Sequence, residues 1–426
     1  MKKALILFFV LSFVHNFVFS QQEKGIIGTS NWLLGWTNFK PKKVDYSETT
    51  KILYGKITTN YTLSNTDTYL LQGKVYVTNN AILTIEPGTV IRGDFDTTAA
   101  LIITKGSKII AEGTPTNPIV FTSSKAISER NAGDWGGLVI MGDAPMNTFG
   151  STANLKFDIE PEFRTFGGTN IENNAGILKY VRVEFAGKSS QGFKEFNAIS
   201  FAGVGNKTKV EYVQSSFSGD DSFEFYGGAV TASNLLSYRA KDDDFDFTQG
   251  IQANLQNCLA LRNPLISSIS GSRCLEIDSY DLSENADFSK KPTNVNASNM
   301  TFLNELPAGG GIDGLVREGV YVGDSSSILT LKNSVISGFS PAMLLNSQID
   351  IVDASLRKIN FIGLLINQCK GNIVSEIGGT SNVDLEGWYG AVNFNNVYAQ
   401  SEPEEIFISP KNDKTPDLRL KINKIN

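Results

Sequence analysis

Two short segments of the sequence repeat the same alternation of aromatic and acidic residues. The first is Asp221-Ser-Phe-Glu-Phe225, and the second, Asp243-Asp-Phe-Asp-Phe247, starts 22 residues later. Leu275-Glu-Ile277 fits as a third, shorter member. Neighbouring side chains of a β-strand point to opposite faces. The alternation therefore predicts apolar residues that point into a core and acidic residues that point away from it.

Stacking these segments would place their acids in a column. Strands pair about 4.8 Å apart, and two like charges about 5 Å apart repel by about 1 kcal/mol in water and about 3 kcal/mol at an effective dielectric of 20. Ca²⁺ accepts several hard oxygen ligands in loose geometry and is the candidate cofactor. The predicted metal ligands are Asp221, Glu224, Asp243, Asp246 and Glu276.

Two other interpretations of the acids stay open at this point. Paired carboxylates also carry out general acid and base catalysis, although no single residue stands out as catalytic. Alternatively, the acids form a solvated edge that pairs with Arg239 and Lys241. We keep Arg239 as a candidate ligand-binding residue. Trp135, flanked by glycines in Gly-Asp-Trp-Gly-Gly, is a second candidate, because an indole ring can stack on a sugar, although a tryptophan in this setting more often packs between coil and loop.

Histidine is absent after the first twenty residues, since the only one is His15. This excludes nucleophile–histidine pairs and histidine-rich metal sites. Cys258, Cys274 and Cys369 are an odd number without metal-like spacing, so we expect buried thiols, with a Cys258–Cys274 disulfide as the alternative. The formal net charge of −6 argues against nucleic acid as a partner.

The elements that must position these residues are short β-strands separated by Gly, Asn, Asp and Ser. A second repeat aligns Asn234–Tyr238 with Asn257–Leu261, and two further copies begin at Asn299 and Asn333. Repeats of 20 to 30 residues with β composition indicate stacked coils, each burying its apolar side on the next. We therefore predict an all-β solenoid, a right-handed parallel β-helix, in which the repeated asparagines form a hydrogen-bonded ladder.

The chain divides into four segments. Residues 1–20 have a basic start and an apolar run typical of a secretory signal peptide, with cleavage expected after Ser20. Residues 21–67 are aromatic around Trp32 and Trp36 and are predicted to cap the first coil. Residues 68–400 form the predicted β-helix, and residues 401–426 a C-terminal tail or cap. No later stretch is apolar enough for a transmembrane helix.

Four further segments are informative as a set: Asn80–Gly93, Gly133–Ile140, Leu178–Gly187 and Ser218–Gly228. Together they resemble a large group of exported β-helix proteins that are common in Bacteroidetes. The resemblance implies a parallel β-helix located in the periplasm, at the outer membrane or outside the cell, and it implies no established reaction. The fold is also similar to that of pectate lyases, but fold alone does not carry function.

The sequence favours an exported binding protein for a glycan or an envelope protein. A Ca²⁺-dependent polysaccharide lyase or a carboxylate-pair glycosidase is the enzymatic alternative. An accessory subunit of an outer-membrane assembly is the third class. The ligand and the oligomeric state are not readable from the residues.

Overall fold

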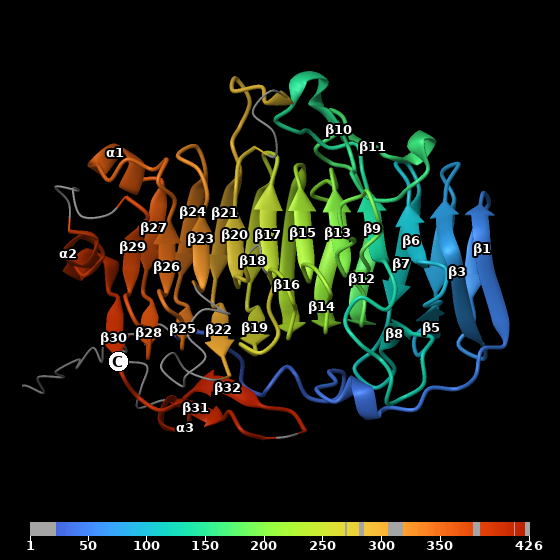
Figure 1. The fold of residues 1–426 in the computed structure, drawn as a ribbon, viewed down its shortest axis with the longest axis horizontal. Coiled ribbons are helices and arrows are strands. Elements are labelled where there is room, and N and C mark those ends of the chain that lie inside the picture. Colours follow the sequence, from blue (N-terminus) through green and yellow to red (C-terminus); the bar gives the residue numbers. More distant parts are fainter. Residues whose placement is uncertain are drawn as a thin grey trace, which may run out of the picture.

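A computed structural model describes residues 23–268, 271–280, 285–305, 318–377, 384–412 and 414–421. The signal-peptide prediction concerns residues that lie outside these ranges. The described chain folds as a parallel β-helix, whose coils stack into one sheet of 28 strands (Figure 1). The predicted fold class is confirmed, and in the described ranges no helix is long and apolar enough to cross a membrane.

The coils stack strands into three faces. Five long strands bend from one face to the next: β1 (Lys51–Ile57), β3 (Thr68–Val77), β12 (Gly176–Glu184), β14 (Lys209–Ser216) and β16 (Ala229–Tyr238). The first face adds β5 (Val90–Gly93), β8 (Ile119–Ser123), β19 (Leu259–Arg262), β22 (Thr301–Asn304), β25 (Val335–Ser337), β28 (Leu365–Asn367) and β30 (Val397–Ala399).

The other two faces consist mainly of short strands. The second face contains β6 (Ala100–Ile103), β9 (Gly137–Met141), β13 (Ile199–Ala202), β15 (Phe223–Tyr226), β17 (Phe245–Thr248), β20 (Leu275–Ile277), β23 (Val320–Val322), β26 (Met343–Leu345) and β29 (Ile373–Ser375). The third contains β2 (Tyr61–Leu63), β4 (Ile82–Ile85), β7 (Lys108–Glu112), β18 (Gln252–Gln256), β21 (Asn294–Ser298), β24 (Ile328–Lys332) and β27 (Ile359–Ile362).

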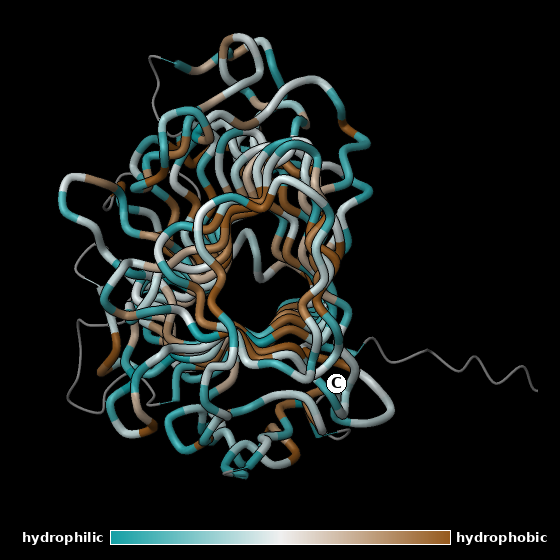
Figure 2. The backbone as a smooth tube through the Cα atoms, turned by 90° about the vertical axis from the view of Figure 1, so that its right-hand side faces the viewer, coloured by the Kyte–Doolittle hydropathy of each residue, from teal (hydrophilic) through white to brown (hydrophobic). Residues whose placement is uncertain are grey.

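Apolar side chains fill the inside of the coils. Figure 2 shows the hydrophobic stretches of the backbone around the centre of the coils. On the second face, the rings of Phe201 and Phe225 stack with centroids 5.0 Å apart, and those of Phe225 and Phe247 repeat this spacing. Each Phe thus lies on the equivalent Phe of the next coil. All three described cysteines are buried and free, which confirms buried thiols over the disulfide.

The repeated asparagines occupy the turn between the third and first faces. Strand register makes Asn234, Asn257, Asn299 and Asn333 equivalent, and all four have a left-handed backbone with φ between 49° and 60°. Asn adopts this conformation more easily than other non-glycine residues. The side chains of Asn257 and Asn299, however, bond to the N-terminal segment. The predicted asparagine ladder is therefore wrong at these two positions, where the side chains bond to the N-terminal segment instead.

The N-terminal segment, residues 23–46, is a strap along the side of the β-helix, where it was predicted to be a cap. It starts beside the C-terminal coils and runs back toward β1 (Figure 1). Ile26, Leu33 and Phe39 are buried in a cluster with apolar residues of the first face. The outward side of that face is apolar there, so it needs a cover. The coils themselves begin earlier than predicted, at Lys51.

The C-terminal segment also lies against the first face. The hairpin of β31 (Phe407–Ser409) and β32 (Asp417–Leu420), preceded by α3 (Pro403–Ile406), buries Phe407 and Leu418 in the cluster that the strap joins. Three short helical segments lie nearer the C-terminal coils: α1 (Asp353–Leu356), α2 (Leu385–Tyr389) and η5 (Val392–Phe394). The predicted tail or cap is therefore a lateral cover.

A long insertion between β9 and β12, residues 142–175, covers part of the second face. It contains η2 (Phe149–Ser151), β10 (Thr152–Asn154), η3 (Pro161–Phe163) and β11 (Thr165–Gly167). Its Phe157 and Phe166 pack with outward residues of the second face, including Val139 and Tyr226. Within the insertion, β10 and β11 form an antiparallel pair.

Candidate functional site

The predicted acids form a column on the outward side of the second face. Strand register pairs Glu224 with Asp246, and Asp246 with Glu276. The next residue in this row is Tyr321. The alternating residues Phe223, Phe225, Phe245 and Phe247 are buried in the core, as the alternation predicts. We call Glu224, Asp246 and Glu276 the acidic column.

A second row of acids lies in the turn that enters the second face. The backbone N–H of Asp243 donates to Asp221 Oδ1 over 2.9 Å. The backbone N–H of Arg273 donates in the same way to Asp243 Oδ1 over 2.5 Å. Each carboxylate therefore receives a backbone proton donor from the following coil. These bonds hold the turns in register, and one carboxylate oxygen of each Asp faces a positive dipole.

Among the residues that the structure describes, two groups of three carboxylates are close enough to share a metal ion. Asp221, Glu224 and Asp246 each offer an oxygen, all within 4.8 Å of one another, and Asp221 does the same with Asp220 and Asp242. Three of the five predicted ligands thus come together. Carboxylate oxygens at such spacing suit Ca²⁺, so the donor set fits the predicted ion.

The remaining two predicted ligands are paired with an arginine. Glu276 Oε2 bonds to the guanidinium of Arg273, which also donates to Glu318 Oε1 over 2.7 Å. Asp243 accepts the backbone bond from Arg273 described above. Neither Asp243 nor Glu276 belongs to the two groups that can share an ion.

Glu224 is buried and receives three donors. Lys194 Nζ lies 2.8 Å from Oε1, and Oε2 accepts from Asn197 Nδ2 and from the hydroxyl of Tyr226. Lys194 therefore supplies the positive charge at this end of the column. Lys194 was missed at the level of sequence because it lies in an irregular segment outside the repeat.

Burial shifts the acids toward their neutral forms. Desolvation raises the pKa of Asp220 to about 8 and that of Asp278 to about 6. Desolvation and the neighbouring carboxylates, Glu224 among them, raise the pKa of Asp221 and of Asp246 well above the usual range. A buried group of like charges relieves its repulsion by protonation or by binding a cation. Both routes are available here.

A fully buried ion pair anchors the turn that carries Asp242 and Asp243. Arg262 Nη1 lies 2.9 Å from Asp244 Oδ2, and both side chains are 0% exposed. The same guanidinium donates to the backbone oxygens of Asp242 and Arg273 over 2.6 and 2.9 Å. Arg262 therefore connects the turn at Asp242 with the turn of the next coil at Arg273.

The acids line a recess beneath the edge of the insertion. Its cavity is about 180 Å³, and its walls include Lys156, Lys194, Glu224, Asp246 and Asp278. A larger cleft of about 700 Å³ lies next to the recess and shares Asn154, Lys156 and Tyr280 with it. One end of this surface is thus lined by acids, and the other is wider.

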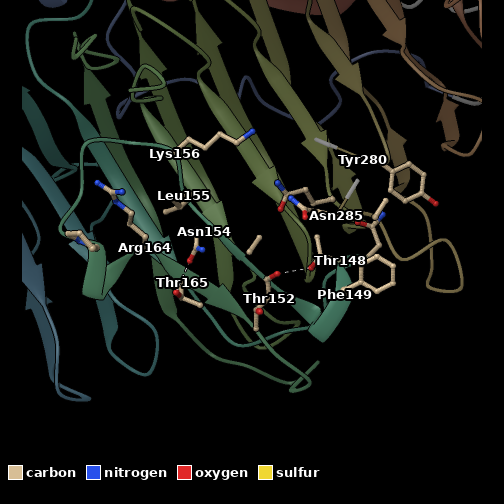
Figure 3. A pocket seen from close by; sticks show the side chains of 15 residues that line it. Thr148, Phe149, Thr152, Asn154, Leu155, Lys156, Arg164, Thr165, Tyr280 and Asn285 are labelled. Atoms are coloured by element: carbon tan, nitrogen blue, oxygen red, sulfur yellow. Dashed lines mark hydrogen bonds between the residues drawn. The ribbon is translucent and has the colours of Figure 1, made fainter. Parts of the chain in front are cut away.

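The larger cleft is lined mostly by polar side chains (Figure 3). Thr148, Asn154, Arg164 and Asn285 supply hydroxyl, amide and guanidinium groups. Phe149 at its rim is 66% exposed. An antiparallel bridge between Thr148 and Ala286 joins the insertion to the loop that follows β20.

The two predicted ligand-binding residues lie away from this cleft. Trp135 is 0% exposed, stacks on Phe121, and donates from Nε1 to the backbone oxygen of Glu184 over 2.8 Å. Its ring fits beside Gly93, where a Cβ atom would lie 2.5 Å from the indole. Trp135 is therefore a packing residue with no face open to a sugar.

Arg239 lies at the start of the turn between β16 and β17. Its guanidinium lies 2.7 Å from Glu305 Oε2 and over the ring of Tyr238. It lines a separate cleft of about 580 Å³ beside the C-terminal hairpin. Arg273 and Lys194, and not Arg239, pair with the acidic column.

This fold and site define a parallel β-helix protein with an acid-lined recess and an adjoining polar cleft on one face. A family model described as a pectate-lyase like beta helix domain matches residues 55–403. The chain belongs to this family. No curated protein and no solved structure matches the chain.

Proposed function

We propose that this protein is an exported β-helix that binds a glycan chain in the cleft between the insertion and the loop after β20. The observation that carries the proposal is the cleft of about 700 Å³ with polar walls and the exposed ring of Phe149 at its rim. Sugar recognition uses such amides, hydroxyls and guanidinium groups for hydrogen bonds, and an aromatic ring for the apolar side of the sugar. The family description, pectate-lyase like, is consistent with a glycan.

Binding is favoured over cleavage because of the state of Glu224. A carboxylate-pair hydrolase needs one carboxylate free to act as base or nucleophile. Both oxygens of Glu224 already accept hydrogen bonds, and the side chain is 1% exposed. Asp246 lines the recess, and its pKa is raised. Glu224 is not accessible enough to act as its catalytic partner.

Ca²⁺ in the acidic recess is proposed as the cofactor of this binding. Its ligands would be Asp221, Glu224 and Asp246, with Lys194 as a competing internal cation. A bound Ca²⁺ would neutralise the recess and leave coordination positions for hydroxyl or carboxylate oxygens of the glycan. Without a bound cation, Lys194 and the protonation of acids would instead reduce the negative charge of the recess.

The test is calorimetric titration of the purified mature chain with a panel of soluble polysaccharides, some neutral and some rich in uronic acids, with and without Ca²⁺. Phe149→Ala should weaken any binding about tenfold, or about 1.4 kcal/mol. Tyr54→Ala is the matched control, because Tyr54 is 74% exposed on β1, away from the cleft. Equal loss in both variants, or no binding across the panel, would reject the glycan cleft.

A further inference from the structure

The strap, residues 23–46, contacts coils that lie far apart along the β-helix. At its start, Lys24 Nζ donates to the backbone oxygens of Leu364 and Asn395 over 3.3 and 3.1 Å. Further along, Asn38 and Gln214 exchange two hydrogen bonds of 2.7 and 2.8 Å. One extended segment thus joins the C-terminal coils to the middle of the molecule.

The repeated turn asparagines form the binding surface for the start of the strap. Asn257 Oδ1 accepts the backbone N–H of Ile27 over 2.8 Å, and Asn299 Nδ2 donates to the backbone oxygen of Glu23 over 2.8 Å. Between these contacts the backbone N–H of Gly25 donates to the backbone oxygen of Asn333 over 2.8 Å. Three consecutive coils therefore hold the strap through one equivalent turn position.

Gly25 shows how closely the strap approaches the coils. Its φ is +72°, and a Cβ atom at this position would lie 2.8 Å from Thr301 Oγ1 and 2.9 Å from Val335 Cγ2. Only glycine fits this backbone and this space. Lys24, beside it, is 5% exposed and is held by the two carbonyl oxygens named above. The contact is therefore a built docking site and not a loose crossing of the surface.

The strap changes how the coils depend on one another. In a solenoid each repeat contacts only its neighbours, so terminal repeats open independently of the rest. The strap adds a direct connection between coils that are not neighbours. Its docking site near Asn395 exists only after the last coils have formed, although the strap itself is near the start of the chain.

We propose that the strap is a latch, which docks after the last coil has stacked and then suppresses opening of the C-terminal coils. The proposal is independent of any ligand in the cleft. It predicts that weakening the contacts at the start of the strap loosens the C-terminal coils selectively. The coil of β7 and β8 contacts a later part of the strap, where Arg130 donates to the backbone oxygens of Pro41 and Val44.

The experiment is native-state hydrogen exchange on the full mature chain, read by mass spectrometry. The variant is Asn257→Gly with Asn299→Gly, which keeps the left-handed turns and removes both side-chain bonds to the strap. Asn234→Gly is the matched control: it has the same turn conformation, with φ of 56°, and in the described chain its side chain bonds to no strap residue. We expect exchange in β28 and β30 to rise about tenfold in the double variant, and to change little in β4 and β7.

Two results would overturn the latch. One is faster exchange confined to residues 23–40, which would make the strap a passive cover. The other is equal acceleration in every coil, which would make it a general stabiliser. Should the double variant not fold, Lys24→Met removes a different strap contact and is read in the same way, with the same outcomes.

Discussion

The outward sides of the first and second faces differ, although the same coils build both. On the first face, outward residues such as Leu236, Leu259 and Leu303 are apolar, and segments from both ends of the chain cover them. On the second face, the covered apolar part ends on β15 at Tyr226, and the acidic column starts on the same strand at Glu224 and continues along the next two coils. Inward residues of both faces belong to one apolar core.

This difference shows that the inward residues build the coils, whereas the outward residues determine what packs against each face. Stacked interior residues build coils almost regardless of what points outward. An apolar outward strip then requires a cover, which here consists of the strap and the C-terminal hairpin. An acidic outward column requires counter-charges, which here are Lys194 and Arg273. Each arrangement has a cleft beside it, of about 700 Å³ near the acidic column and of about 580 Å³ near the C-terminal hairpin.

The largest effect is expected at the ion pair that links the two faces. Arg262→Met removes a buried guanidinium from the end of β19 and leaves Asp244 buried without its partner. We expect the free energy of unfolding to fall by about 3–5 kcal/mol, measured by urea denaturation. Arg357→Met is the control, because Arg357 is 74% exposed and its pair with Asp353 is worth at most about 1 kcal/mol.

A double variant separates charge from packing at the same position. Adding Asp244→Asn to Arg262→Met removes the stranded charge and should restore part of the lost stability. If the double variant is as unstable as the single one, the guanidinium matters for its bonds to backbone oxygens and not for its charge.

The next effect tests the cover of the first face. Leu33 is 0% exposed in the strap, whereas its neighbour Leu34 is 57% exposed. Leu33→Ala should lower the free energy of unfolding by about 2–5 kcal/mol, because it opens a cavity between the strap and the first face. Leu34→Ala should change it by less than about 0.5 kcal/mol. Similar losses in both variants would show that the strap is not packed on the face as described.

Measured over one pH unit, a smaller effect is expected from the buried acids of the second face. The pKa of Asp220 in the folded state, about 8, lies above the value of about 3.9 for an unfolded Asp. Between these two values the folded state binds more protons than the unfolded state, so stability falls as the pH rises. The slope is at most about 1.4 kcal/mol per pH unit for each such carboxyl. Asp220→Asn should flatten the curve measured between about pH 4 and about pH 8.

Calcium should oppose this loss if it binds the ionised acids. At about pH 8, free Ca²⁺ at about 100 times its Kd would add about 2.7 kcal/mol to the free energy of unfolding, and a chelator would remove that gain. Asp246→Asn should lose most of the response, while Asp353→Asn, on exposed α1, should keep it. An unchanged melting temperature with chelator in the parent chain would leave Lys194 as the cation of the recess.

Sequence reasoning was strongest for the coils. The spacing of 22 residues between Asp221 and Asp243 is the true register of β15 and β17, and the asparagine alignment is also correct. Both succeed because each coil must repeat its inward pattern to bury its core. The same reasoning misplaced Trp135 among candidate ligand residues, since nothing local tells an indole in the core from one at the surface.

The sequence by itself determined the parallel β-helix and the acidic column, because a strand alternates its side chains and a solenoid stacks equivalent positions. Only the tertiary structure decided what lies against these surfaces. The strap meets Asn395, and Lys194 meets Glu224, across irregular segments that follow no repeat. Such contacts depend on where non-repeating chain happens to be apolar or charged once the coils are stacked. For that reason the cover of the first face and the cleft on the second could not be predicted from spacing.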